Sequence, residues 1–110
     1  KVQISHDMSA LVEAEGYLEK ALEFSPKRQQ IQFTLSAVKL NLGKVDESIK
    51  LLQDSIDNDP NISESWWRLA LVNYQAGRVD EAKKVAQQVK DLGLKLNDQG
   101  EKVINGILGQ

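Results

Sequence analysis

The stretch SESWWRLALVNYQAGRVDEA, residues 63–82, contains the pattern that decides the fold class. Its first part carries apolar residues at helical spacing, with Trp66, Leu69 and Ala70 on one helix face. Gly77 follows, and a glycine, which adopts positive φ at little cost, is typical of a helix end. A second amphipathic segment begins at Val79. The stretch therefore predicts two helices joined by a tight turn.

The same pattern occurs 34 residues earlier in the chain. Gly43 aligns with Gly77 and Pro26 aligns with Pro60, so the residues that end helices recur together with the apolar ones. A period of this length is typical of stacked helical repeats. No segment alternates polar and apolar residues for long enough to predict a sheet. The sequence therefore predicts an all-α fold of antiparallel helix–turn–helix repeats with a 34-residue period.

The periodicity predicts six helices, at residues 9–24, 29–42, 45–57, 63–76, 79–92 and 98–108. We assign them to one domain, residues 1–110, with the second helix of a partial repeat at 9–26, complete repeats at 29–60 and 63–93, and a capping helix at 97–109. Ser63 is the expected N-cap of its helix, and Asp98 with Glu101 resembles a capping box. Gly100 and Gly106 each weaken the last helix by about 1 kcal/mol relative to alanine.

Composition excludes several functional classes. The chain has 110 residues, a net charge of −2 and no cysteine, which excludes disulfides and thiolate metal sites and argues against a nucleic-acid partner. No apolar run is long enough to span a bilayer, so we expect no direct membrane insertion by this segment. Because the chain begins at Lys1, we interpret it as a piece of a longer protein. The residues do not fix its compartment, and a soluble, cytoplasmic domain is the favoured expectation.

The residues from Trp66 to Ala70, followed by Tyr74, Gly77 and Ala82, resemble the signature of the tetratricopeptide repeat (TPR) family. Residues 14–26, AEGYLEKALEFSP, look like the second half of another such repeat. The resemblance implies that the helical pairs stack as a short right-handed α-solenoid. It also implies that the first helices of the pairs line a concave face, where an extended peptide or a partner helix binds.

The departures from this signature lie mostly in the middle unit. Gln32 and Lys39 stand where the family has its Trp and Tyr, and Ser48 and Ser55 replace alanines, which puts the packing tightness in doubt. A narrower resemblance rests on residues 25–31, SPKRQQI, which look like the start of the TPR tails of some bacterial O-antigen ligase or polymerase-type membrane proteins. It implies a soluble tail attached to a membrane glycan enzyme.

The resemblance places candidate binding residues on the first helices. We expect Trp66 in the core, whereas Trp67, about 100° away around the helix, would face a ligand. Burial of Trp67 against the next helix stays an open alternative. The full candidate set for peptide or protein binding is Phe33, Ala37, Leu40, Trp67, Arg68, Leu71, Tyr74 and Lys102. For Phe33, Ala37 and Leu40, packing against the neighbouring helix is the favoured alternative.

One known mode of the family is a Lys, Asn and Arg clamp that holds the terminal carboxylates of a chaperone. Phe33 and Ala37 stand where its first Lys and Asn would fall, and Glu64 stands at the place of a later Lys. Only Arg68 matches the clamp. The resemblance therefore argues against that ligand, although a carboxylate of a partner could still pair with Arg68.

The sequence predicts no enzyme activity, no cofactor and no metal site. His6 stands beside Asp7, but no nucleophile or second ligand is placed by spacing. The basic pairs at 27–28 and 83–84 are interpreted as solvated surface. We predict a protein–protein interaction module whose partner is a protein or peptide. The alternative is a structural spacer or self-association element, in which the apolar side of the 9–24 helix makes the chain a homo-oligomer.

Overall fold

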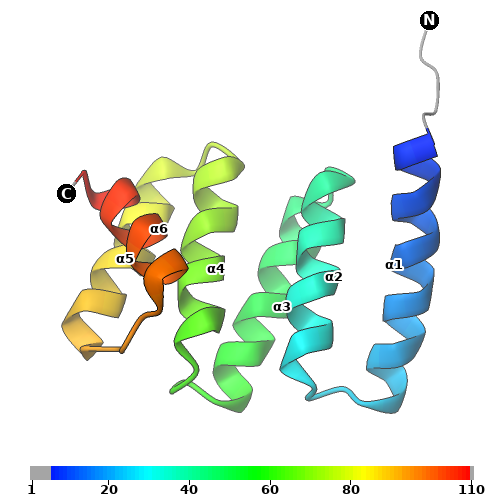
Figure 1. The fold of residues 1–110 in the computed structure, drawn as a ribbon, viewed down its shortest axis with the longest axis horizontal. Coiled ribbons are helices and arrows are strands. Elements are labelled where there is room, and N and C mark those ends of the chain that lie inside the picture. Colours follow the sequence, from blue (N-terminus) through cyan, green and yellow to red (C-terminus); the bar gives the residue numbers. More distant parts are fainter. Residues whose placement is uncertain (1–5, 110) are drawn as a thin grey trace, which may run out of the picture.

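The computed structural model describes residues 6–109, with side chains from residue 8 onward (Figure 1). The described chain forms helices and connecting turns. These helices are α1 (His6–Phe24), α2 (Gln29–Asn41), α3 (Val45–Asn58), α4 (Ser63–Gln75), α5 (Val79–Leu92) and α6 (Asp98–Leu108). The predicted all-α repeat fold is confirmed, and α1 begins three residues before its predicted start. The His6–Asp7 side chains lie outside the described residues.

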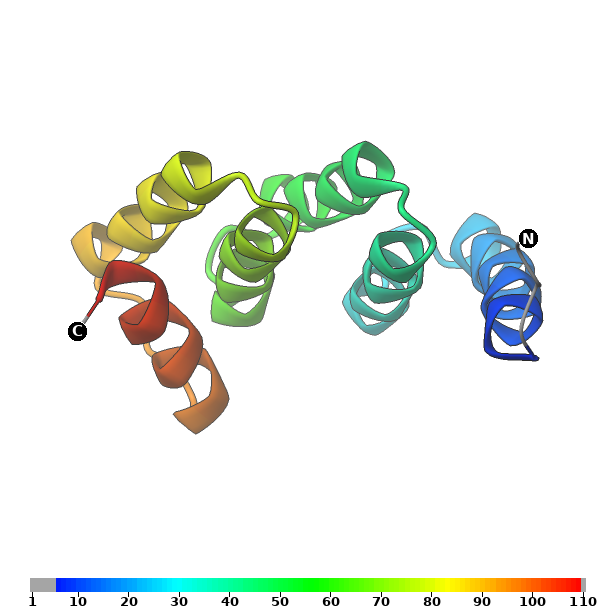
Figure 2. The same cartoon turned by 90° about the horizontal axis from the view of Figure 1, so that it is seen from above.

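Successive helices run in alternating directions and pack against their neighbours in the chain (Figure 1). Seen from above, α2, α4 and α6 lie along one side of the molecule, and α3 and α5 lie along the other (Figure 2). We call the side lined by α2, α4 and α6 the first-helix face. The helix α4 lies in the middle of this arrangement and packs against α2, α3, α5 and α6. None of the described helices is long and apolar enough to cross a membrane.

The two tight turns between α2 and α3 and between α4 and α5 have the same construction. Gly43 has φ +80° and Gly77 has φ +82°, a region that other residues enter only with strain. After each glycine the next N–H reaches back to the helix: Lys44 donates to the Lys39 carbonyl and Arg78 to that of Asn73, both at 2.8 Å. These are the helix-ending bonds that the recurring glycine predicts.

The helices approach closely because small residues occupy the sites where they cross. Ala82 and Ala86 on α5 have no exposed surface, and neither has Ser48 or Ser55 on α3. The Ser48 hydroxyl donates to the carbonyl of Ser36 at 2.7 Å. The Ser55 hydroxyl lies 2.8 Å from that of Ser65. Since both buried hydroxyls have partners, serine replaces alanine without loosening the packing.

Two predicted helix caps are wrong by one residue. Ser63 is the first residue of α4, and Ile62 precedes it as the N-cap without a side-chain hydrogen bond. At α6 the cap is Asn97, whose Oδ1 accepts the N–H of Gly100 at 2.8 Å. Asp98 lies inside the helix instead. An Asn-Asp pair offers two good cap residues in succession, and sequence alone does not say which one takes the extended conformation.

Candidate functional site

Trp67 belongs to the core and is 1% exposed. The ring lies under α6, where Gly100 comes so close that a Cβ at that position would stand 2.6 Å from Trp67 Cδ1. The interpretation of Trp67 as a ligand-facing residue is therefore wrong, and the alternative, burial against the next helix, is confirmed. The neighbouring Trp66 is half-buried, and its indole N–H donates to the carbonyl of Pro60 at 2.8 Å.

The error has a physical reason. A helix at the surface buries one face, but α4 packs against four helices. Its buried residues Ser65, Trp67, Leu69, Ala70, Val72 and Asn73 extend around most of its circumference. Both tryptophans can then pack, and the deeper position goes to Trp67, which faces the last helix. Trp66 packs at the edge of the core rather than at its centre.

Arg68 joins the two repeats on the first-helix face. Its guanidinium carbon lies 5.3 Å from the ring centroid of Phe33 and 5.0 Å from that of Trp67. Both distances are within the range of cation–π attraction. The Nε of Arg68 also donates to Glu64 at 2.7 Å. This arrangement covers Phe33, which is buried as the favoured alternative predicted.

The remaining candidate residues stay accessible. Ala37, Tyr74 and Lys102 are exposed, and Leu40, Leu71 and Arg68 are half-buried. Tyr74 is 47% exposed, the highest exposure of a large apolar side chain on α2, α4 or α6 among the described residues. The accessible candidates thus lie on α2, α4 and α6, whereas Phe33 and Trp67 are buried.

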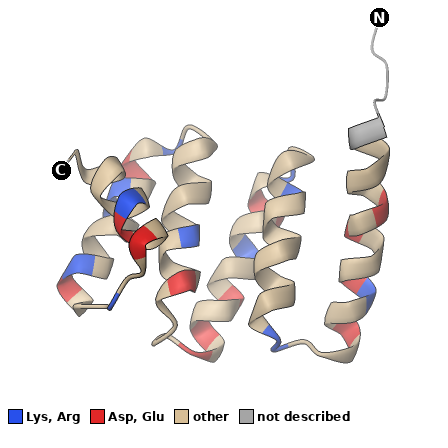
Figure 3. Ribbon diagram, viewed as in Figure 1, with Lys and Arg blue, Asp and Glu red and all other residues tan. Residues whose placement is uncertain are grey.

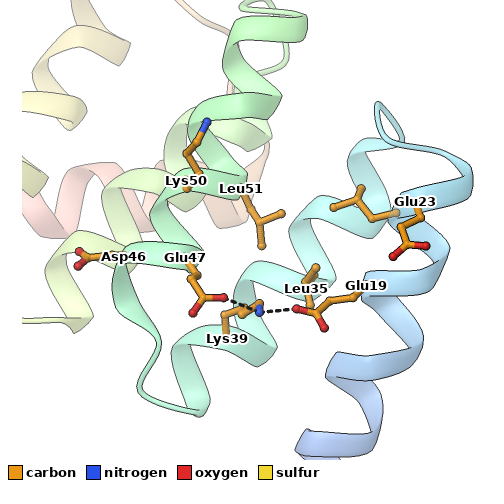
Figure 4. Close-up of a pocket in the computed structure, with 9 residues that line it drawn as sticks. Glu19, Glu23, Leu35, Lys39, Asp46, Glu47, Lys50 and Leu51 are labelled. Carbon is orange, nitrogen blue, oxygen red and sulfur yellow. Dashed lines mark hydrogen bonds and ion pairs between the residues drawn. The ribbon is translucent and has the colours of Figure 1, made fainter.

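A second polar constellation, which the sequence did not predict, joins α1, α2 and α3. The Lys39 ammonium lies 2.7 Å from Glu19 and 2.7 Å from Glu47 (Figure 4). It also lies 2.8 Å from Glu15. Lys44 adds a further ion pair to Glu15 at 2.7 Å. We call these five residues the Lys39 cluster. The signal was present in the sequence: a lysine in a column of core residues requires carboxylate partners, since a buried charge is otherwise very costly.

The charges of the Lys39 cluster shift its pKa values in the expected directions. Burial alone would lower the pKa of Lys39, but hydrogen bonds to Glu15, Glu19 and Glu47 outweigh it and raise the pKa. Hydrogen bonds from Lys39 and Lys44 lower the pKa of the Glu15 carboxyl below its ordinary value of 4.5. Oxygens of Glu15, Glu19 and Glu47 lie within 4.8 Å of one another, a spacing that a cation could bridge. The Lys39 ammonium supplies that positive charge.

The described chain is thus a helix–turn–helix repeat protein with an accessible face on its first helices. Residues 6–71 match one tetratricopeptide repeat family model, and residues 64–92 match another. The chain belongs to the tetratricopeptide repeat family. No curated protein matches it. Repeats of this family are generally protein–protein interaction modules and typically non-enzymatic scaffolds. The narrower resemblance to tails of membrane glycan enzymes stays a prediction, because these matches do not bear on it.

Proposed function

We propose that the first-helix face binds a peptide or a helix of a partner protein. The observation that carries the proposal is the exposed ring of Tyr74, which stands on α4 with the half-buried Leu71. On α2, Ala37 is exposed and Leu40 is half-buried. Tyrosine, tryptophan and arginine dominate the binding energy of measured interfaces. A Tyr beside apolar neighbours, with Arg68 on the same helix, has the composition of such a hot spot.

Arg68 and Lys102 could pair with acidic groups of a ligand that is otherwise apolar. Arg68 is fixed between two aromatic rings, so it keeps its orientation when a ligand arrives. It can offer further N–H donors to a carboxylate while Nε stays on Glu64. Lys102 on α6 is exposed and adds a second cation. We therefore expect an apolar segment with one or two acidic residues and modest affinity, because the face spans only three first helices.

The experiment is a selection of peptides from a random display library, followed by titration of the selected peptides. We expect Tyr74→Ala to weaken them by about 30-fold, the size of a 2 kcal/mol hot spot. The free energy of unfolding of Tyr74→Ala should change little, since the Tyr74 ring is half-exposed. Val79→Ala is the matched control, because Val79 is also exposed but begins α5. Selected peptides whose affinity is unchanged by both Tyr74→Ala and Ala37→Glu would refute the proposal.

A second candidate function, self-association, is favoured by an observation on α1. Tyr17 and Phe24 are the most exposed large apolar side chains in the described chain. Residues Ala14, Leu18 and Ala21 are only half-buried, whereas their counterparts one repeat later, Ser48, Leu52 and Ser55, have no exposed surface. Sedimentation of the chain and of its Tyr17→Glu variant over a range of concentrations tests this candidate. Mass that stays monomeric throughout excludes it.

A further inference from the structure

The described helices form two equivalent furrows on the side away from the first-helix face. One lies between α1 and α3 over α2, and the other lies between α3 and α5 over α4. Their lining residues correspond through the repeat: Leu35 with Leu69, Glu47 with Glu81, and Leu51 with Val85. We call them the α1–α3 furrow and the α3–α5 furrow. Because the two furrows correspond through the repeat, the residues that differ between them distinguish the α1–α3 furrow from its counterpart.

The α1–α3 furrow has an apolar centre. Its main part is a cleft of about 660 Å³, and Leu22, Leu35 and Leu51 lie along it (Figure 4). A second part of about 360 Å³ shares Leu22 and Leu51 with the first, so the two adjoin. The space suits one or two large side chains of a partner.

Carboxylates surround this apolar centre. The main part is lined by Glu19, Glu23, Asp46 and Glu47, and only Lys39 and Lys50 oppose them. Acidic residues are spread along α1 (Figure 3). The second part adds Asp54 and Asp57 against a single Lys27. Negative charge therefore exceeds positive charge along the whole furrow.

These carboxylates remain available to a ligand. The side chains of Glu19 and Glu47 are 52% and 59% exposed although each pairs with Lys39. A carboxylate has more acceptor sites than one such bond uses. Asp46 is more exposed still and pairs with Arg78 at the surface, and Lys50 is occupied by Asp54. The Asp46–Arg78 and Lys50–Asp54 pairs are exposed and therefore weak, so a cationic ligand can take the place of Arg78 or Lys50 at little cost in free energy.

The second part of the furrow holds a polar atom without a partner. Gln32 is 2% exposed and lines this part, and its Oε1 accepts no hydrogen bond within the described chain. A buried acceptor left unpaired is costly. In the neighbouring repeat the same position is Trp66, whose N–H is satisfied by Pro60. The α3–α5 furrow also has Gln53 in place of Glu19 and Asn73 in place of Lys39.

We propose that the α1–α3 furrow is a second docking surface, for a cationic amphipathic segment of a partner protein. Apolar side chains of that segment pack on Leu22, Leu35 and Leu51, and flanking Lys or Arg residues pair with Glu19, Glu23 and Glu47.

The charge of the furrow decides between classes of ligand. Nucleic acid and anionic membrane surfaces are repelled by an acidic rim. A divalent cation meets the Lys39 ammonium where the carboxylates converge. A peptide that is both apolar and basic can pack on the leucines and pair with the carboxylates.

The test is a titration of the chain with a short labelled peptide that carries two leucines flanked by arginines. Glu23→Lys changes the furrow, whereas Glu13→Lys makes the same charge change on α1 at an exposed residue that lies outside the furrow. We expect Glu23→Lys to weaken binding by about threefold to tenfold. Glu13→Lys should change it by less than about twofold. Leu51→Ala should weaken binding as well, and Tyr74→Ala should not.

Amide chemical shifts locate the peptide independently of these variants. Changes centred on Leu22, Gln32 and Leu51 support the proposal. Changes centred on Ala37 and Tyr74 overturn it and place the peptide on the first-helix face. Equal weakening by Glu13→Lys and Glu23→Lys overturns it too, because binding is then general attraction to an acidic protein. The same peptide with glutamate for arginine should not bind.

Discussion

Replacing Gly100 by alanine tests the packing of α6 on α4 more sharply than any larger change. In a free helix the substitution is favourable by about 1 kcal/mol, because alanine loses less conformational entropy. Here the new Cβ would stand 2.6 Å from Trp67 Cδ1 and 2.9 Å from Nε1. Such overpacking of a well-filled core costs about 1–3 kcal/mol. We therefore expect the free energy of unfolding to fall by about 1 kcal/mol.

Gly106 on the same helix is the matched control. A Cβ at that position meets nothing within 4 Å, so Gly106→Ala keeps the full helix-forming gain. We expect it to raise the free energy of unfolding by about 0.5–1 kcal/mol. The two alanine variants should then differ by about 2 kcal/mol in the free energy of unfolding, although both make the same chemical change on α6.

Urea unfolding followed by circular dichroism measures this difference. With a typical dependence of stability on urea, the midpoints of the two variants should differ by about 1 M. Tryptophan fluorescence in a Trp66→Phe background reports on Trp67 alone among the tryptophans, and Gly100→Ala should shift its emission. If Gly100→Ala is as stable as Gly106→Ala and leaves this emission unchanged, α6 does not lie against Trp67 and the derived burial is wrong.

The remaining predictions concern the Lys39 cluster. Lys39→Met should lower the free energy of unfolding by about 2–3 kcal/mol, because Glu15 then stays buried with only Lys44 as a partner. Adding Glu15→Gln to Lys39→Met should recover most of this loss, and urea titrations measure both variants. Since the folded pKa of Glu15 is lowered, its contribution to stability is full above its ordinary value of 4.5 and disappears as the pH falls through the folded pKa. The free energy of unfolding should therefore fall from neutral to acidic pH, and it should fall less in Glu15→Gln than in the unsubstituted chain. An equal fall in both would contradict the lowered pKa of Glu15.

The helices and turns could be predicted because local residues determine them. Gly43, Gly77 and Pro60 end helices through their own backbone preferences, whatever surrounds them. The bounds of α2 to α6 accordingly lie within about two residues of the predicted ones. The predictions were wrong where the burial of a residue depends on which other helices surround it. The depth of Trp67 is set by α6, whose approach depends on the missing side chain of Gly100.

The residues of the candidate site also differ in how far the sequence could predict them. The positions of Tyr74, Leu71 and Ala37 on the first-helix face follow from the repeat, so the sequence indicated them. The Lys39 cluster does not follow from the repeat, because the next repeat has Ile49, Gln53 and Asn73 in place of Glu15, Glu19 and Lys39. The departure of Lys39 from the repeat was visible in the sequence. Glu15 and Glu19 lie on the preceding helix, however, and only the fold shows that they come close to Lys39.

The position of α1 connects the Lys39 cluster to the proposed furrow. Among the described helices, the backbone of α1 comes close only to that of α2. The cluster adds side-chain links from α1 to Lys39 and, through the same ammonium, to Glu47 on α3. Asn73, the counterpart of Lys39, donates instead to the Leu69 carbonyl within its own helix. The residues that hold the wall of the furrow in place are thus also part of its acidic rim. Loosening them should weaken the cationic peptide more than any ligand of Tyr74.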